Sequence, residues 1–300
     1  MREGLFGIAL LAALAAGWKA LRGASPALAV AGGLYAAALA ILAWFARTPW
    51  IACVLLHFEA MVLSKTLALV RAPRGSVSFG RGCLFLTLSP TLDVRRAFVS
   101  DPSVNRVAGL GHMATGLLQM FCGFQGSTIA ARLGLLAAGT YPASWVRAVA
   151  LLLVLDGFGR TFAGLCRALG TASDDAFDRP WLASDLADFW GRRWNQFVGR
   201  ALFFEVYRPW SRRLGALAAS MATFLASGVL HEVLYVLPTG GPFGHYLVFF
   251  GLQGAGVVAS AKLSSARLRW ALMWSVLIAT TPVFFGEPYP SAFPLEGLLR

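Results

Sequence analysis

The stretch Met221–Pro238, MATFLASGVLHEVLYVLP, decides what kind of protein this chain is. It runs for 18 residues with one acidic residue, Glu232, and with no Lys or Arg. A helix that crosses a bilayer needs about 20 mostly apolar residues, because the hydrocarbon core is about 30 Å thick and each helical residue adds about 1.5 Å. Residues 214–236 are therefore predicted to form a membrane-spanning helix that carries the dipeptide His231-Glu232.

Similar apolar segments extend along the whole chain. Hydrophobic residues make up 57% of the sequence and charged residues only 13%, against about 25% in a soluble domain. We expect an all-α, polytopic membrane protein with about eight transmembrane helices, in one membrane-embedded domain over residues 1–300. The other seven predicted spans are residues 4–18, 26–46, 50–70, 107–123, 145–168, 243–261 and 270–286. The apolar segment 81–92 is too brief to span and is predicted to lie at the interface.

The first of these segments has two interpretations. Residues 4–18 are short and Ala-rich, as a cleaved signal peptide would be. We expect a retained helix instead, because the next part of the sequence is another membrane segment and not a polar mature domain.

The positions of Lys and Arg predict the topology. The net charge is +12, but these residues lie in short loops between apolar segments, so nucleic acid is not indicated as a partner. With the N-terminus outside, 20 of the 26 Lys and Arg residues fall on the inner side and five on the outer side. Cytoplasmic loops retain positive charge, so the long loop 170–213 is predicted to be cytosolic and interfacial. Its charge could attract anionic lipid headgroups or the phosphates of an acyl carrier.

The cysteines indicate neither a disulfide framework nor a zinc site. The four residues, Cys53, Cys83, Cys122 and Cys166, form no C-x-x-C pair. Three of them lie in apolar segments, where cysteine usually acts as a small buried hydrophobe.

His231 and Glu232 are ionisable residues inside a predicted span. Ser227, His231 and Tyr235 are spaced by four, so on a helix they form a polar stripe on an otherwise apolar surface. Glu232 points about 100° away from that stripe and needs a partner of its own. A histidine in a dry pocket can stay neutral, which suits a general base near pH 7. The alternative is a histidine that only hydrogen-bonds a neighbouring helix.

The loop before this span contains the run Asp185–Gln196, DLADFWGRRWNQ. As a helix, this run would place Asp188, Arg192 and Asn195 on one face. Asp188 and Arg192 are four residues apart, in the order that favours a salt bridge.

A second face of the same predicted helix is apolar and carries Trp190, Trp194 and Phe197. Trp and Arg together are typical of a segment that lies at the level of the lipid headgroups. Gly191 weakens a helix by about 1 kcal/mol relative to Ala, so the chain could bend there. Taken alone, the segment could be an anchoring helix with no chemistry.

Together, the two motifs resemble a known family. The runs PWLASDLADFWGRRWN (Pro180–Asn195) and ATFLASGVLHE (Ala222–Glu232) are similar to the wax synthase branch of the membrane-bound O-acyltransferases. Plant long-chain-alcohol acyltransferases have a closely similar FWGRRWN stretch and a later SG-x-x-HE. The superfamily is characterised by an Asn on an inner loop and a His in a membrane helix, a few tens of residues apart. Here the interval between Asn195 and His231 is 36 residues.

The resemblance implies transfer of a fatty acyl group from a thioester to a hydroxyl. The expected co-substrates are acyl-CoA, or an acyl-carrier thioester, and a hydrophobic alcohol. No metal or redox cofactor is expected. His231 is then the catalytic histidine and Asn195 its partner, which either positions a substrate or donates a hydrogen bond to developing charge. Supporting substrate-binding roles fall to Trp190, Arg192, Arg193, Trp194, Ser227, Glu232 and Tyr235, with the two arginines facing the CoA phosphates.

The depth of His231 needs an explanation. It lies about 27 Å along a straight helix from Arg213, at about 1.5 Å per residue, and so towards the outer side. Either the helix begins later, near Leu217, or a central reaction chamber is reached through a long tunnel. We expect a tunnel, with the thioester entering from the cytosol and the alcohol entering from the bilayer.

Two other classes of function compete with the acyltransferase. A proton-coupled transporter would use His57, Glu59, Asp156 and His231 along one path, and it would have broken helices or repeated halves. A non-catalytic membrane scaffold would retain only the fold. The abundance of Ala and Arg suggests a bacterial protein, hence a bacterial cytoplasmic (inner) membrane. The sequence does not indicate an oligomeric state or the identity of the alcohol.

Overall fold

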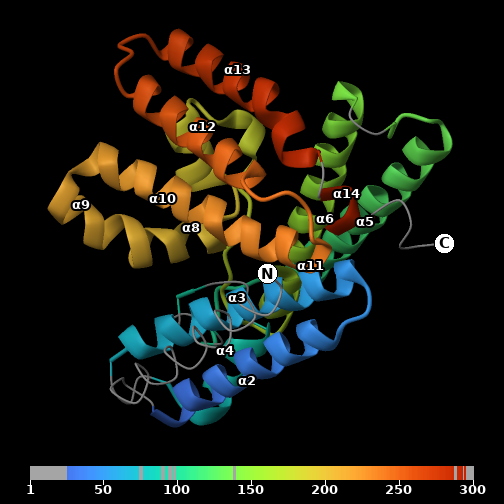
Figure 1. The fold of residues 1–300 in the computed structure, drawn as a ribbon. Coiled ribbons are helices and arrows are strands. Elements are labelled where there is room, and N and C mark those ends of the chain that lie inside the picture. The colour runs from blue at the N-terminus through green and yellow to red at the C-terminus, as the bar shows by residue number, and fades with distance from the viewer. Residues whose placement is uncertain are drawn as a thin grey trace. The chain divides into compact units, whose positions relative to one another are not determined.

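The computed structural model describes residues 26–292 and residue 294, apart from short gaps at 74–76, 89–91, 94–96, 98, 138–139 and 287–288. Within these residues the chain is all-α and contains no β-strand (Figure 1). The predicted fold class is therefore confirmed for this part of the chain. The first predicted span, residues 4–18, lies outside the described residues.

Six helices among the described residues are long and apolar enough to cross a membrane. They are α2 (Pro26–Phe45), α3 (Pro49–Arg71), α5 (Arg106–Arg132), α6 (Tyr141–Ala168), α13 (Ala266–Phe285) and the span Ala216–Thr239. The span Ala216–Thr239 consists of α10 (Ala216–His231), the π-helix η4 (Glu232–Val236) and α11 (Leu237–Thr239). Each of the six overlaps a predicted span, so the chain is a multi-pass integral membrane protein.

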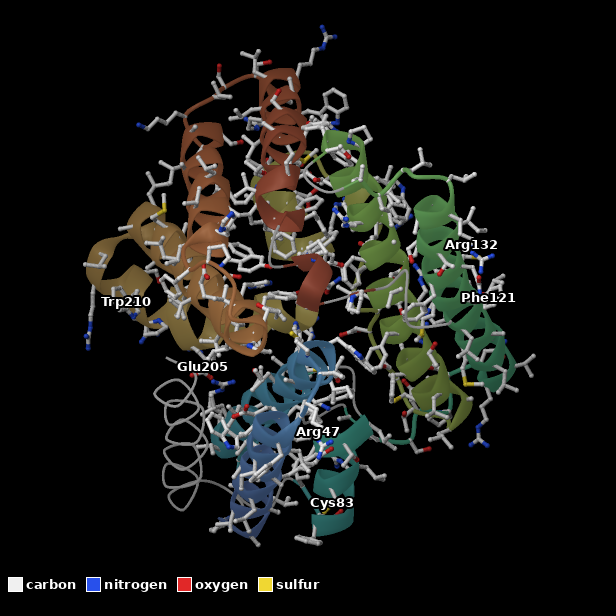
Figure 2. The ribbon with its side chains drawn as sticks, turned by 45° about the vertical axis from the view of Figure 1, so that its right-hand side comes forward. Arg47, Cys83, Phe121, Arg132, Glu205 and Trp210 are labelled. Carbon is white, nitrogen blue, oxygen red and sulfur yellow. The ribbon has the colours of Figure 1, made fainter. Side chains whose placement is uncertain are left out.

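Large apolar side chains cover the outer surfaces of these helices. Phe121 on α5 is 56% exposed and projects away from the ribbon (Figure 2), and Leu118 on the same helix is 61% exposed. Water disfavours such a continuous apolar surface, whereas lipid tails are as apolar as these side chains. The exposed apolar residues therefore mark the surface that faces the hydrocarbon.

The observed helix boundaries differ from the predicted ones in length. α5 runs past residue 123 to Arg132, because the hydroxyls of Ser127 and Thr128 bond to the carbonyl of Phe124 (2.8 and 3.0 Å) and so do not interrupt the helix. α12 (His245–Ser260) has 16 residues, fewer than the about 20 of a full span, so the count of eight spans is not confirmed. α4 (Phe79–Leu88) has only 10 residues and agrees with a non-spanning segment.

The chain folds into two compact units, of which the first comprises Met1–Leu118, Gly157–Asp175 and Leu237–Thr239. In this unit the N-terminal part of α5 lies against α6 with little more than backbone between them. A Cβ on Gly116 would lie 2.6 Å from the carbonyl oxygen of Gly157, and one on Gly109 would lie 2.5 Å from the backbone nitrogen of Ala168. Small residues allow such close approach, which is how helices associate in lipid without a hydrophobic driving force.

Polar side chains also link elements within the first unit. Asp175 Oδ1 lies 2.8 Å from His112 Nε2 on α5 and 3.1 Å from Arg167 Nη2 on α6. The ammonium of Lys65, which is 2% exposed, donates to the carbonyl of Leu86 at 3.1 Å. These bonds satisfy polar groups that would be costly to bury alone.

The second unit comprises Gln119–Asp156, Ala176–Val236 and Gly240–Arg300. Its long helices are α10, α12 and α13, and the predicted cytosolic loop forms a chain of short helices beside them (Figure 1). These are η1 (Pro180–Leu182), α7 (Leu186–Asp188), the π-helix η2 (Phe189–Arg193), α8 (Gln196–Leu202), the π-helix η3 (Phe203–Tyr207) and α9 (Arg208–Leu214).

Two glycines of the second unit set the distances between its helices. A Cβ on Gly228 of α10 would lie 3.0 Å from the Cα of Leu247 on α12, and one on Gly256 of α12 would lie 2.7 Å from a methyl of Leu186. Leu186 is fully buried and shares one apolar cluster with Met273 of α13. The loop is therefore seated on α12 and α13.

Candidate active site

His231 is the last residue of α10, directly before the π-helix η4. Its Nδ1 lies 2.7 Å from the backbone carbonyl oxygen of Ser227. A carbonyl can only accept, so Nδ1 donates the hydrogen, and in the neutral ring the lone pair is on Nε2. Ser227 thus meets His231 through its backbone and not through its hydroxyl. Single π-helical turns inside α-helices are frequent at functional sites.

Four aromatic side chains surround the imidazole of His231. Its ring centroid lies 4.5 Å from that of Phe250, 5.6 Å from Phe284, 5.7 Å from Tyr235 and 6.0 Å from Tyr246. Tyr235 stacks on the imidazole at 26°, so the predicted proximity of His231 and Tyr235 is confirmed. The imidazole thus lies among aromatic rings from η4, α12 and α13.

Glu232 has the separate partner that its position required. Its Oε1 accepts hydrogen bonds from the backbone N–H groups of Gly244, Tyr246 and Leu247, at 3.0, 2.9 and 3.1 Å. These donors lie at the N-terminus of α12, where they have no partner within the helix and where a negative charge is favourable. Glu232, which is 2% exposed, therefore caps α12 from the residue next to His231.

The interpretation of Asp185–Gln196 as one continuous helix is wrong. The helix of α7 and η2 ends at Arg193, Trp194 is extended, and Asn195 is left-handed with φ 39° and ψ 64°. Asn195 accepts this conformation because its side-chain Oδ1 receives the N–H of Val198 at 3.3 Å and starts α8. The break follows Arg193 and not Gly191, and Asn195 does not continue the helical face of Asp188 and Arg192.

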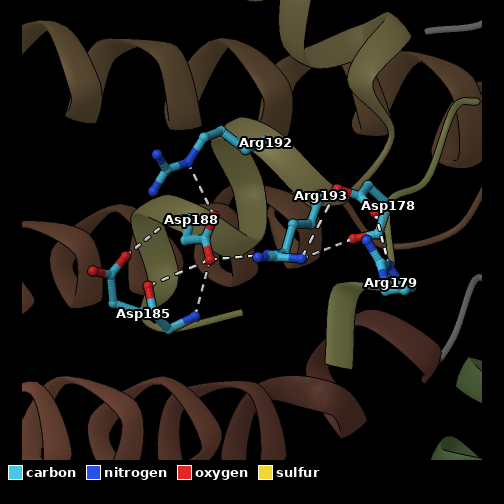
Figure 3. Close-up of polar contacts among 7 residues, drawn as sticks. Asp178, Arg179, Asp185, Asp188, Arg192 and Arg193 are labelled. Carbon is cyan, nitrogen blue, oxygen red and sulfur yellow. Dashed lines mark hydrogen bonds and ion pairs between the residues drawn. The ribbon is translucent and has the colours of Figure 1, made fainter. Parts of the chain in front are cut away.

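Asp188 lies between two arginines of the motif (Figure 3). Its carboxylate oxygens are 3.0 Å from Arg192 Nε and 2.9 Å from Arg193 Nε, and the backbone N–H of Ser184 donates to it at 3.0 Å. The predicted Asp188–Arg192 salt bridge is confirmed. Burial disfavours the charged carboxylate, but the bonds from Ser184 and Arg193 and the charges of both arginines outweigh it and lower the pKa of Asp188.

The two motif arginines differ in how much of each remains available to an anion. The Arg193 side chain is 23% exposed, and its Nη1 also donates to the carbonyl of Asp178 at 3.3 Å. The Arg192 side chain is 75% exposed, and only its Nε is directed at Asp188. Arg192 is thus the better placed of the two to meet a phosphate group in the surrounding solution.

Trp190 connects the motif loop with α12. Its indole N–H donates to Gln253 Oε1 at 3.1 Å, and its ring lies 5.9 Å from Phe250 and 5.9 Å from Trp194. Since Phe250 also contacts His231, the predicted loop residue and the predicted histidine share one aromatic neighbour. Arg192 and Arg193, in contrast, gather around Asp188.

Several residues of this site were not predicted from the sequence. Gln253 gave a usable signal, because an amide inside an apolar segment calls for a polar partner. Phe250, Phe284 and Tyr246 gave none, since aromatic residues are common in every apolar segment of this chain.

Comparison with known proteins finds similarity in the part of the chain that holds the two motifs. Residues 173–252 match the Membrane bound O-acyl transferase family, a segment that contains both motifs. Probable long-chain-alcohol O-fatty-acyltransferase 6 of Arabidopsis thaliana is 39% identical over 139 residues, which cover 41% of this chain and 40% of that protein. Probable long-chain-alcohol O-fatty-acyltransferase 7 of Arabidopsis thaliana is 37% identical over 133 residues, 39% of each chain.

A third relative is the Long-chain-alcohol O-fatty-acyltransferase of Simmondsia chinensis, 36% identical over 107 residues, which cover 31% of this chain and 30% of that protein. The similarity thus spans about two-fifths or less of each relative's length. These relatives are plant proteins and give no support to the bacterial membrane suggested by the composition. Residues 173–252, which contain the motif loop and the histidine helix, are similar to the Membrane bound O-acyl transferase family, and the resemblance to plant long-chain-alcohol O-fatty-acyltransferases is confirmed.

Proposed function

We propose that this protein is an acyltransferase that moves a fatty acyl group from a thioester, acyl-CoA, to the hydroxyl of a hydrophobic alcohol and forms an ester. One observation carries the proposal most directly. His231 lies in an aromatic enclosure inside a membrane helix, with the hydrogen on Nδ1 fixed by Ser227 at 2.7 Å. That arrangement holds the basic nitrogen, Nε2, in the form that a general base needs.

In the proposed reaction, Nε2 of His231 takes the proton of the alcohol as the hydroxyl oxygen attacks the thioester carbonyl. The carbon–sulfur bond of the resulting tetrahedral intermediate then breaks, and the same proton passes from Nε2 to the departing thiolate. Acid–base catalysis of this kind contributes about 10²–10⁴-fold. In this proposal the aromatic side chains around His231 limit the access of water, so that the alcohol competes better than water for the acyl group.

Asn195 is the proposed partner of His231. Its Oδ1 is occupied by the N–H of Val198, so the NH₂ group is the part of its side chain that can donate to a substrate. A donor directed at the thioester carbonyl would stabilise the negative charge that develops there. The local geometry thus favours the donor role over the other role that the resemblance allows.

The remaining predicted site residues divide between binding and support. Arg192, exposed at the loop surface, is proposed to bind the phosphates of CoA, while Arg193 holds the loop through Asp188 and Asp178. Trp190, Trp194 and Tyr235 are proposed to line the path of the apolar chains.

Ser227 and Glu232 are proposed to support the site through hydrogen bonds that involve backbone groups. Ser227 orients His231 through its carbonyl, and Glu232 fixes the N-terminus of α12, on which Phe250 lies.

The proposed placement puts the loop 170–213 in the cytosol and His231 deep in the bilayer. Gly215, with φ 79°, ends α9 and lets α10 begin at Ala216. The histidine therefore lies about 22 Å from the start of its helix instead of about 27 Å from Arg213, at about 1.5 Å per residue. A tunnel from the cytosol for the thioester and a lateral entry for the alcohol are still required.

The test uses the purified full-length chain in detergent with palmitoyl-CoA and a panel of alcohols that includes a fatty alcohol, a sterol and a terpenoid. The expected result is free CoA released in equal amount with an ester of at least one alcohol. Thiol release without ester would indicate hydrolysis, and no turnover with acyl-CoA or with an acyl-carrier thioester would contradict the proposal.

A further inference from the structure

Gln253 lies in the middle of α12 and is fully buried, and after His245 the other residues of this helix are apolar or small. A buried amide without partners is strongly disfavoured in an apolar environment. Both ends of this amide are bonded. Gln253 Oε1 accepts the indole N–H of Trp190 at 3.1 Å, and Gln253 Nε2 donates to Thr280 Oγ1 on α13 at 2.7 Å.

The chain of bonds through Gln253 has one possible direction. The hydroxyl of Thr280 donates to the backbone carbonyl of Val276 at 2.7 Å, so its oxygen is left to accept from the NH₂ group of Gln253. At the other end an indole nitrogen can only donate, so it requires the carbonyl oxygen of Gln253. The orientation of the Gln253 amide is therefore fixed at one end by Thr280, whose hydroxyl is bonded to the carbonyl of Val276, and at the other end by the indole N–H of Trp190.

This chain of bonds sets the position of the Trp190 ring. Phe249 and Phe250 precede Gln253 by one helical turn and lie on the same side of α12. The indole of Trp190 rests against both rings, at 6.3 and 5.9 Å, while its N–H is held by Gln253. The ring centroid of Phe250 in turn lies 4.5 Å from that of His231, so a change in the position of the Trp190 ring alters the packing around the histidine.

We propose that Gln253 is a positioning residue, which fixes the motif loop through the indole N–H of Trp190 against α12, the helix whose Phe250 contacts His231. The inference rests on the proposed acyltransferase function, because its consequence is the placement of Asn195 and His231 for one reaction. Trp190 and Asn195 belong to one short segment, and a loop that shifts at Trp190 moves the asparagine with it. Misplacement by about 1 Å can cost up to about 100-fold in rate.

A double-mutant cycle tests the coupling. Gln253→Leu removes both bonds of the amide, and Trp190→Phe keeps an aromatic ring but removes the N–H. Each is expected to lower kcat by about 10-fold or more, while the KM for acyl-CoA changes less than kcat. The kcat of the double variant is expected to be no lower than that of either single variant. Gln253→Leu leaves the indole N–H of Trp190 unpaired and Trp190→Phe leaves the carbonyl oxygen of Gln253 unpaired, whereas the double variant has neither group.

A second comparison uses a matched pair on α13. Thr280 and Thr281 are 6% and 7% exposed, and each donates to the carbonyl four residues earlier, but the Gln253 amide bonds to Thr280. Thr280→Val removes the acceptor that orients the amide and is expected to speed backbone hydrogen exchange over residues 186–194. Thr281→Val is expected to leave that exchange unchanged.

Hydrogen exchange is independent of turnover, so it separates the two proposals. Wild-type protein without ester formation would contradict the proposed function, whatever the exchange shows. Equal exchange in Thr280→Val and Thr281→Val, or losses of kcat that multiply in the double variant, would overturn the role of Gln253.

Discussion

Asn195 adopts a left-handed backbone conformation, and its Oδ1 accepts the backbone N–H of Val198 at 3.3 Å. The side chain therefore has a structural half, the oxygen that caps α8, and a half that can act on a substrate, the NH₂ group. These two halves can be separated by substitution.

Asn195→Asp is expected to keep the cap and the left-handed backbone but to lose the donor. We expect kcat to fall by about 100-fold or more while the thermal unfolding temperature stays close to that of the wild type, because one oxyanion donor contributes about 10²–10³ in kcat. Steady-state kinetics and thermal unfolding in the same detergent measure both quantities. Asn195→Gly tolerates the backbone conformation and lacks both halves, so it should lose both kcat and stability. Full activity in Asn195→Asp would reduce the residue to a helix cap.

The carboxylate of Glu232 also has two properties that substitution can separate, its negative charge and its role as a hydrogen-bond acceptor. Glu232→Gln retains an oxygen for the N–H groups of Gly244, Tyr246 and Leu247, whereas Glu232→Ala leaves them uncapped. We expect Glu232→Ala to lose about 1–2 kcal/mol of stability and most of the activity, and Glu232→Gln to retain the greater part of both. If the two variants lose activity alike and remain equally stable, the carboxylate acts on the substrate and not on α12.

The lowered pKa of Asp188 predicts a pH dependence of stability. Because the folded pKa lies below the unfolded value of about 3.9, the contribution of Asp188 is complete above that value and is lost as the pH falls through the folded pKa. Asp188→Asn should therefore lower Tm by roughly 5 °C at pH 7. The difference between wild type and variant should shrink below about pH 4. A difference that stays constant down to pH 3 would contradict an ionised Asp188 as its source.

Arg192 and Arg193 are predicted to behave differently although they are adjacent. Arg192→Gln should raise the KM for acyl-CoA several-fold with little change in kcat, and the effect should diminish at high salt because the side chain is 75% exposed. Arg193→Gln should instead lower Tm, since it removes a partner of Asp188. Arg212→Gln removes an exposed charge of α9 outside the motif and serves as the control. An unchanged KM in Arg192→Gln would remove Arg192 from the CoA site.

The fold was largely predictable from the sequence because the hydrophobic spans have to match the thickness of a bilayer. All the predicted spans from 26–46 to 270–286 except 243–261, six in number, have helical counterparts that are long enough to cross it. The end of α5 was missed because Ser127 and Thr128 satisfy their hydroxyls on the helix itself, so polar residues there do not indicate a terminus.

The geometry around the predicted site residues was only partly predictable. The spacing of Asp188 and Arg192 correctly gave their ion pair, because i, i+4 neighbours meet on any helix. The same periodicity predicted the wrong helical face for Asn195, because Asn195 itself has a left-handed backbone and its side chain caps a new helix, α8. Long-range partners such as Gln253 and Phe284 depend on how distant helices meet, which periodicity within one segment does not encode.

His57 provides a matched control for the catalytic histidine. It too lies in a membrane helix, and its Nδ1 meets the carbonyl of Cys53 at 2.7 Å, in the same i, i−4 arrangement as His231 and Ser227. A loss of activity that follows only from the removal of an intramembrane imidazole should therefore appear in both alanine variants.

The most direct measurement is the initial rate of ester formation by His231→Ala beside His57→Ala, each at equal folded concentration in the same detergent. We predict that His231→Ala loses at least about 10³-fold in rate, while His57→Ala stays close to the wild type. Ester formation at the wild-type rate by His231→Ala would contradict the assignment of His231 as the general base.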